Sequence, residues 1–388
     1  MEIRAQKNVL KNAVSAAKKA LSKVVIQEER GHLLCDVVDD TLSFRSTNND
    51  LKARCVIPVE NISKENFSFT IDPKIFEKLI SKIDIDSIHM SFDPKEFILK
   101  VYTTDSEKSF SSLQSFPPDK MLTFDYTTKT NKTVYPVNKE VLLFALNYAS
   151  KFLAALKDDQ KQFDYVIINK GIVYSANGSN KMGLIVFKAF EKIENIRIRK
   201  IILPLYISFV ESLPGDDVNI IETDKDIGVE SIDGTMYYSF LKSNTNPVNI
   251  PKEHIKSEGP YTRIDKNKLI KVIDRIMASN TSSTNTGIKI ILSGSGESAC
   301  LDVSLVSSLK ITENFSCVRV DDDQNDIEHA VDYKIFKTIL TSFDTDKEVR
   351  LHINDDGRAF KIYCSGEVAK NKFILVGIGS YAKIIKNQ

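Results

Sequence analysis

The sequence has few of the residues on which catalytic and metal sites are usually built. Its 388 residues include five histidines and five cysteines. No two cysteines have the C-x-x-C spacing of a zinc or redox site, and no two histidines have the spacing of a metal-ligand pair. Most of the cysteines lie in apolar strand patterns, where a small buried thiol is the usual interpretation. We therefore expect no disulfide, no zinc and no other cofactor.

Long apolar runs and an excess of charge are also missing. No stretch approaches the roughly 18–20 residues of a membrane span. The N-terminal MEIRAQKNVLKNAV has no apolar core followed by a small-residue cleavage site, so we expect a cytoplasmic protein without a membrane partner. The formal net charge is +1, from 53 basic and 52 acidic residues. Any contact with DNA must therefore depend on the local placement of charge.

Sequence motifs for catalysis are missing as well. The glycine-rich SGSG at 293–296 is not followed by the helix that a phosphate cradle needs. The acidic VDDDQND at 320–326 lacks the central glycine and closing glutamate of a calcium loop. His89 and His352 fall at outward positions of alternating strands, where a structural or solvated role is expected. These absences favour a non-enzyme over an enzyme with an unrecognised site.

What the sequence does contain is a repeat. Residues 72–84 read DPKIFEKLISKID and residues 332–344 read DYKIFKTILTSFD, and a weaker copy begins LPLYISFVESLP at 203. Each copy has the apolar spacing of an amphipathic helix and precedes an alternating strand. A second set of amphipathic helices is predicted at 8–21, 140–153 and 266–279. The sequence therefore predicts one structural unit that is repeated three times along the chain.

A period near 130 residues is too long for a solenoid and has the size of an ordinary domain. We predict an α+β fold made of three tandem two-helix, antiparallel-sheet domains, at 1–124, 125–256 and 257–388. Pro117 and Pro118 mark the first connector, and four glycine or proline breaks within 242–260 mark the second. The alternative is two unrelated domains whose amphipathic helices match by coincidence.

Basic residues recur on the predicted helices. A solvated polar face explains such residues on any single helix, but their repetition on domains of one kind favours a shared basic surface. The candidates in the first domain are Lys11, Lys18, Lys19, Lys23, Lys74, Lys78 and Lys82. Those in the third are Lys268, Lys271, Arg275, Lys334 and Lys337, and the less basic middle domain offers Lys161 and Arg199.

These features together resemble one known family, the bacterial DNA polymerase III sliding clamp, or β subunit. LSFRSTNNDLKARCVIPVE at 42–60 is similar to a strand–turn–strand of that family. DPKIFEKLISKI is similar to its second helix, and YSANGSNKMGLIVF at 174–187 to a turn in its middle domain. The likeness covers the whole chain in order. The chain departs from the family at that turn and at Gly377, which stands where the family's tail has a proline.

The resemblance implies a processivity factor for DNA replication. Two protomers would close head to tail into a homodimeric ring around double-stranded DNA, with the helical lysines facing phosphates without sequence preference. Short peptides of the replicative DNA polymerase, the clamp loader and repair proteins would bind an apolar pocket. The alternative is a clamp-like interaction scaffold of phage or plasmid type that is not loaded on DNA.

The resemblance also assigns residues to the pocket and to the dimer interface. The pocket would be lined by Gly178, Met182, Pro247, Ile250, Ile374, Val376 and Ile378. Strand alternation places the last three on one face. The dimer contacts would be Phe110 at an edge of the first domain and Ile276 and Met277 at the end of a third-domain helix. For every one of these residues the alternative is packing in a domain core.

Overall fold

The computed structural model describes most of the chain. The described residues are 1–21, 31–48, 50–103, 109–121, 124, 132–153, 163–178, 181–243, 261–278, 287–306, 312–320, 326–343, 348–353 and 359–380. No helix in these ranges is long and apolar enough to cross a membrane.

The described part of the first third contains two α-helices and nine strands. In order these are β1 (Glu2–Gln6), α1 (Lys7–Ala17), β2 (Leu33–Val38), β3 (Thr41–Thr47), β4 (Leu51–Pro58), β5 (Glu60–Asn61), β6 (Phe67–Ile71), α2 (Pro73–Ser81), β7 (Ser87–Asp93), β8 (Ile98–Tyr102) and β9 (Phe110–Gln114). A short 3-10 helix, η1 (Lys18–Ala20), extends α1.

The remaining two thirds repeat this order of elements. The second consists of β10 (Thr133–Asn138), α3 (Lys139–Ser150), β11 (Tyr165–Asn169), β12 (Ile172–Asn177), β13 (Lys181–Phe187), β14 (Ile196–Arg199), α4 (Leu203–Ser212), β15 (Asp217–Glu222), β16 (Asp226–Ser231) and β17 (Met236–Leu241). The third consists of β18 (Tyr261–Asp265), α5 (Lys266–Ala278), β19 (Gly287–Ser293), β20 (Cys300–Leu305), β21 (Thr312–Ser316), β22 (Val318–Val320), β23 (Ile327–Asp332), α6 (Tyr333–Ser342), β24 (Glu348–Ile353), β25 (Ala359–Val368) and β26 (Asn371–Ser380).

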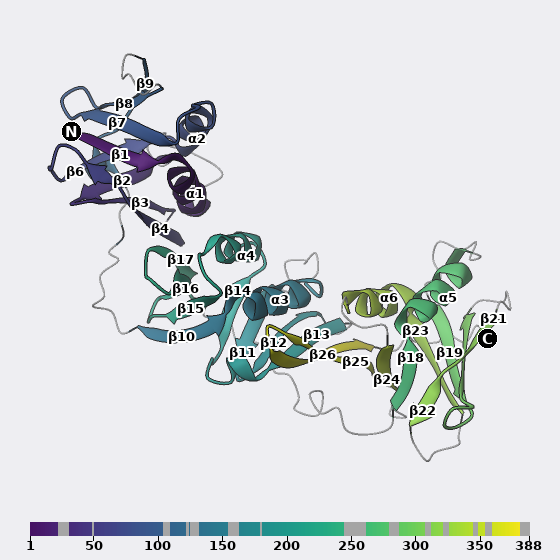
Figure 1. Cartoon of the computed structure of the whole chain (residues 1–388). Coiled ribbons are helices and arrows are strands. Elements are labelled where there is room, and N and C mark those ends of the chain that lie inside the picture. The colour runs from purple at the N-terminus through teal and green to yellow at the C-terminus, as the bar shows by residue number, and fades with distance from the viewer. Residues whose placement is uncertain are drawn as a thin grey trace. The chain divides into compact units, whose positions relative to one another are not determined.

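Each third therefore follows one plan: a strand, a helix, four strands, a second helix and three strands, with β5 and β22 as short additions (Figure 1). The pairing repeats too, because the first strand of each third pairs antiparallel with the strand after its second helix. This order confirms the predicted α+β fold of three repeated two-helix units.

Contacts divide the chain into two compact units: 1–139 with 204–243, and 140–203 with 244–388. The division follows the sheets. An eight-stranded sheet, β10-β15-β16-β17-β4-β3-β2-β6, lies within the first unit, and a nine-stranded sheet, β14-β11-β12-β13-β26-β25-β24-β18-β22, within the second. Strands of the middle third thus contribute to both units, and domain boundaries at 124/125 and 256/257 stay a prediction.

The repeated passage folds as a helix because an aspartate caps its first turn. The Asp72 carboxylate accepts hydrogen bonds from the backbone N–H of Lys74, at 2.7 Å, and of Ile75, at 3.1 Å. Asp332 accepts the same pair of bonds from Lys334 and Ile335. Each cap satisfies donors that the first helical turn leaves free. The repeated aspartate in the sequence is therefore the start signal of α2 and α6.

A lysine at the start of the first helix of each third holds the end of the second. The Nζ of Lys139 donates to the carbonyl of Leu213, after α4, at 3.0 Å. Lys7 donates in the same way to Ile83 after α2, and Lys266 to Phe343 after α6. An ammonium satisfies carbonyls that a helix C-terminus leaves without a partner and complements its partial negative charge. This contact recurs in every third.

Two glycines let helices approach the nine-stranded sheet closely. Gly183 of β13 lies directly opposite Gly377 of β26. A Cβ on Gly183 would lie 2.1 Å from the Phe152 ring, and a Cβ on Gly377 would lie 2.2 Å from Cγ2 of Ile339. Both neighbours belong to the helical layer, so the two glycines fix the face of the sheet that the helices cover.

We expect Gly377→Ala to destabilise the protein, because Ile339 must move to make room for the new methyl group. Overpacking of a close-packed core typically costs about 1–3 kcal/mol, which would appear as a lower urea midpoint of unfolding. Ser365→Ala on β25 is the matched control: Ser365 is exposed, and its substitution should change stability by less than about 0.5 kcal/mol. Equal midpoints for the two variants would contradict this account of Gly377.

Candidate functional site

Helices pair on one side of the sheets. In the first third α1 contacts α2, and in the third α5 contacts α6 (Figure 1). The buried residues of α1 are Leu10, Ala13, Val14, Ala16 and Ala17, so this apolar stripe faces the core. Amphipathic spacing of this kind leaves the other face of a helix to solvent. Each basic residue predicted from the sequence can either be exposed on that outer face or have a partner within the protein.

Several of these candidates already have partners within the protein. Lys18 forms an ion pair with Glu77 of α2, and Lys337 forms one with Asp274 of α5. Arg275 donates to the carboxylate of Glu313, which belongs to β21. Such exposed pairs hold side chains in place but contribute little to stability.

Lys19 has a different position. Its ammonium donates to the carbonyl of Ser208 on α4 at 2.7 Å. Partial burial lowers the pKa of Lys19 below the ordinary lysine value. This lysine therefore joins two helices of the first unit and is less available to a ligand than its sequence position suggests.

Seven candidates remain exposed on the helices or at their ends. These are Lys11, Lys74, Lys78, Lys82, Lys268, Lys271 and Lys334. Helices α1 and α6 contain no acidic residue, and Glu77 and Asp274, the acidic residues of α2 and α5, are paired with Lys18 and Lys337. The helical surfaces of the first and third repeats are therefore locally positive although the chain is nearly neutral.

The middle repeat does not supply an equivalent set. Lys161, like Lys23, lies outside the described residues. Arg199 is exposed, but it lies opposite Tyr165 at the end of the β11–β14 pair. Alternation along β14 puts it on the sheet face that the helices do not cover, because Ile196 and Ile198 take the helical side. The structure does not bring Arg199 together with the helical lysines.

The pocket candidates on β13 and β26 do come together. Met182 lies opposite Ile378, and Leu184 lies opposite Val376, on adjacent antiparallel strands. With Ile374 they belong to an apolar cluster that also contains Tyr165, Ile167, Tyr174 and Tyr363. Because Gly183 and Gly377 occupy the alternate positions, this cluster lies on the sheet face away from the helices. We call it the β13–β26 cluster.

The members of the β13–β26 cluster differ in exposure. Val376 is fully buried and Ile378 is 7% exposed, so these two form its floor. Met182 and Ile374 are only partly buried and form its rim. Gly178, with φ of +58°, lies in the turn after β12, where a glycine tolerates the left-handed backbone. Pro247 and Ile250 lie outside the described residues.

Two strand junctions and two strand edges concern the expected dimer contacts. The fourth strand of the first third, β4, pairs antiparallel with the last strand of the second, β17. The fourth strand of the second, β13, pairs in the same way with the last strand of the third, β26. Among the described strands, β21 of the third repeat pairs only with β20, and β9 of the first only with β8. These two edges lack the pairing that their counterparts have.

The candidate contact residues fall differently around these edges. Phe110 begins β9 and is 48% exposed, with the Tyr102 ring 5.9 Å away and the Lys100 ammonium 5.0 Å from its centroid. Met277 is partly buried. Ile276 is fully buried in the core of α5, so its side chain is not at the surface of this protomer. Ile276 is buried because it lies on the apolar stripe of α5.

The two histidines that were expected at outward strand positions are buried and have a structural role. His89 is 6% exposed and stacks on Tyr102 at 4.5 Å, and His352 is 5% exposed and packs against Tyr363 at 4.5 Å. Large aromatic neighbours cover both rings, which strand alternation alone cannot reveal. Within the described ranges, no cluster of three or more His, Cys, Asp or Glu side chains could hold a metal ion.

The fold has counterparts among known proteins. The sequence profile of the family "DNA polymerase III beta subunit, N-terminal domain" matches residues 1–121. No curated protein sequence matches the chain significantly.

Solved structures extend the likeness to the whole chain. The chain is similar to the DNA polymerase III subunit beta of Pseudomonas aeruginosa (TM-score 0.75, 13% identity), covering 99% of this chain and 100% of that one. It is also similar to the DNA polymerase sliding clamp of Bacillus subtilis (0.74, 15%, covering 99% of each chain). The clamp of Caulobacter crescentus gives 0.72 at 11%, covering 99% of this chain and 100% of that one.

At these identities the likeness establishes the fold, and the whole chain has the fold of the DNA sliding clamps. Within that fold class, residues 1–121 also match the sequence profile of the N-terminal domain of the DNA polymerase III beta subunit.

Proposed function

We propose that this protein is a DNA sliding clamp, in which two copies close head to tail into a ring around duplex DNA. The observation that carries the proposal is the pairing rule of the repeats. Within the chain, the fourth strand of one repeat pairs with the last strand of the next repeat. Among the described strands, β21, the fourth strand of the third repeat, and β9, the last strand of the first, lack this pairing. A second copy can supply both missing partners, and two identical junctions then close the assembly without an open filament.

The helical lysines suit a clamp that must slide. Contacts between lysines and phosphates are independent of sequence and weaken with salt. A ring is retained on DNA by its topology, so strong affinity is not needed and would hinder movement. A nearly neutral chain with locally positive helices fits that requirement better than a strongly basic one. No base-reading element is required.

The β13–β26 cluster is the partner site of this proposal. Its buried floor and partly buried rim have the apolar character of a groove that takes a short peptide. The replicative polymerase, the clamp loader and repair proteins would each bind there and be tethered to DNA. The clamp itself performs no chemistry, and a role in replication places it in the cytoplasm.

The first test of the ring is retention on DNA. With a clamp loader present, the protein should stay on nicked circular DNA and dissociate when the circle is linearised. Phe110→Asp, which puts a charge at the exposed edge of β9, should convert dimer to monomer in light scattering and abolish retention. Ile232→Asp is the matched control, because Ile232 is 58% exposed but lies between β16 and β17.

Equal loss from circular and linear DNA would refute the ring and favour the interaction scaffold. A Phe110→Asp variant that remains dimeric would show that β9 is not the closing edge.

The second test concerns the lysines of α2. Reversing Lys74 and Lys78 to glutamate should weaken binding to duplex DNA and flatten its salt dependence. Each lost phosphate contact removes roughly 0.9 from the slope of log K against log salt, or about two for the pair. The measurement is fluorescence anisotropy of a labelled duplex across a salt series. Lys188→Glu with Lys192→Glu is the control, since both lysines are exposed outside the α-helices, and an equal effect there would contradict a helical wall.

The third test concerns the rim of the β13–β26 cluster. Met182→Glu should lower the affinity for short peptides of the host's replicative polymerase at least about tenfold, because an unpaired charge would face the apolar ligand. Isothermal titration gives the Kd. Val320→Glu is the control, because Val320 is 39% exposed on β22 and outside the cluster. Unchanged affinity for Met182→Glu would remove this residue from the site.

A further inference from the structure

A row of directly opposite residues runs from the β13–β26 cluster toward one edge of the nine-stranded sheet. Leu184 of β13 lies opposite Val376 of β26, which lies opposite Tyr363 of β25. Tyr363 in turn lies opposite Arg350 of β24, and Arg350 lies opposite Arg263 of β18. Directly opposite residues of a sheet point to the same face. The apolar cluster is therefore continued, on its own face, by two guanidinium groups, which we call the Arg263–Arg350 pair.

The row changes from buried and apolar to exposed and charged within one strand. Tyr363 is 2% exposed, whereas Arg350 and Arg263 are both exposed. The Arg350 guanidinium lies 4.9 Å from the centre of the Tyr261 ring. A cation–π contact of this kind holds the position of a guanidinium without neutralising its charge. Two cations that solvent can reach thus border the apolar surface.

Within the described ranges, neither arginine of this pair forms an ion pair with a carboxylate. The acids next along the same strands, Asp265 and Glu348, lie directly opposite each other. The Asp265 carboxylate accepts from the backbone N–H of Lys268 at 2.9 Å and so caps α5. Each acid is diagonal to the arginine on the facing strand, and diagonal neighbours are roughly 7–8 Å apart. The arginine forks are therefore open to a carboxylate from outside the chain.

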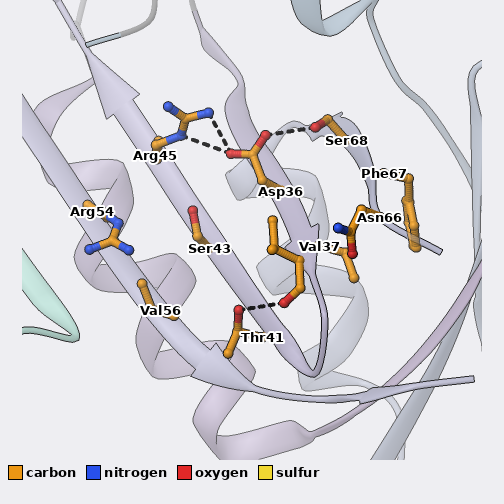
Figure 2. Close-up of a pocket in the computed structure, with 11 residues that line it drawn as sticks. Asp36, Val37, Thr41, Ser43, Arg45, Arg54, Val56, Asn66, Phe67 and Ser68 are labelled. Carbon is orange, nitrogen blue, oxygen red and sulfur yellow. Dashed lines mark hydrogen bonds and ion pairs between the residues drawn. The ribbon is translucent and has the colours of Figure 1, made fainter. Parts of the chain in front are cut away.

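Another pair of directly opposite arginines shows how the chain compensates such charges internally. Arg45 of β3 lies opposite Arg54 of β4. The Asp36 carboxylate accepts from Nε of Arg45 at 2.8 Å (Figure 2). The negative charge of Glu230 in turn interacts with Arg54. Like charges at directly opposite positions destabilise a sheet, and two carboxylates offset them here. The pair on β18 and β24 has no such carboxylate among the described residues.

We propose that the peptide bound at the β13–β26 cluster has an acidic residue whose carboxylate binds the Arg263–Arg350 pair. The inference rests on the proposed peptide site and adds a determinant of specificity to it. An arginine fork binds a carboxylate through two parallel hydrogen bonds, and an anion between the two arginines relieves their mutual repulsion. A nucleic acid fits less well, because Asp265 and Glu348 repel a row of phosphates.

Strand spacing determines where the acidic residue lies in the peptide. Neighbouring strands are about 4.8 Å apart, and an extended chain advances about 3.3 Å per residue. β24 and β18 are the second and third strands beyond β26, so Arg350 and Arg263 lie roughly 10 and 14 Å across the sheet from Val376. The acidic residue is therefore expected about three or four residues from the apolar side chain that contacts the cluster at Val376.

The test uses the full-length protein and two blocked peptides of opposite direction in isothermal titration, acetyl-Leu-Leu-Leu-Ser-Ser-Glu-amide and acetyl-Glu-Ser-Ser-Leu-Leu-Leu-amide. At low salt, one of them should bind about fivefold more tightly than its Gln counterpart, and added salt should reduce this ratio. Arg263→Gln and Arg350→Gln should each lower the ratio to about twofold or less, while the affinity for the Gln peptide stays unchanged. Both side chains are exposed, so neither variant should lose the fold.

Two controls test the place and the spacing. Arg199→Gln removes an exposed arginine of the same sheet face on β14, at the other edge, and should leave the ratio unchanged. A peptide with the glutamate directly beside the leucines should lose the advantage over its Gln counterpart, because the carboxylate then falls short of the arginines. A ratio near one for both directions in the unmodified protein, or a loss of the ratio in Arg199→Gln, would overturn the inference.

A further variant separates this inference from the peptide site on which it rests. Met182→Glu should weaken the Glu and Gln peptides alike, because both contact the β13–β26 cluster. If neither peptide binds, or if Met182→Glu has no effect, the peptide site itself fails and the inference fails with it. If the Gln peptide binds normally but the Glu peptide has no advantage, only the inference fails. Displacement of the Glu peptide by a single-stranded oligonucleotide through the same two arginines would also overturn it.

Discussion

The structure depends on how strand edges are satisfied. An open sheet edge presents unpaired N–H and C=O groups, and proteins cover such edges or pair them. In this chain the edge of one repeat is paired by the next, through β4 with β17 and β13 with β26. The same solution cannot be completed within one chain, because β9 and β21 remain at the ends of their sheets in the described structure. In the proposed ring, assembly with a second copy would continue the pairing rule by which the chain itself folds.

The same pairing determines the two faces of the nine-stranded sheet. Where β13 meets β26, glycines alternate with large apolar residues in register. Gly183 and Gly377 admit Phe152 and Ile339 on the helical side, while Met182, Leu184 and their partners form the β13–β26 cluster on the other. One junction thus fixes both the helical layer and the candidate peptide site. The glycine at 377 keeps the backbone N–H and lets Ile339 of α6 approach the strand.

The helix starts and the strand faces could be predicted from local signals in the sequence. The predictions that failed all concerned contacts between distant segments. Asp72 and Asp332 predicted the starts of α2 and α6, because a helix cap depends only on neighbouring residues. Strand alternation likewise placed Ile374, Val376 and Ile378 on one face. Contacts between distant segments could not be predicted in this way. Lys18 and Lys19 were expected on the shared basic surface but bind Glu77 and the carbonyl of Ser208. Ile276 lies on the buried face of α5, and aromatic neighbours cover His89 and His352.

The distribution of charge suits the sliding ring that we propose. A uniformly basic surface would bind DNA tightly and increase the drag on movement. Here the acids on α2 and α5 each neutralise one lysine, through Glu77 with Lys18 and Asp274 with Lys337. The other lysines of α2 and α5 are exposed, and the neighbouring helices α1 and α6 contain no acidic residue. The helical side of the first and third repeats is thereby locally positive, whereas the β13–β26 cluster on the other face of its sheet is apolar. In the proposed clamp, a partner bound at that cluster would not compete with DNA for the same side chains.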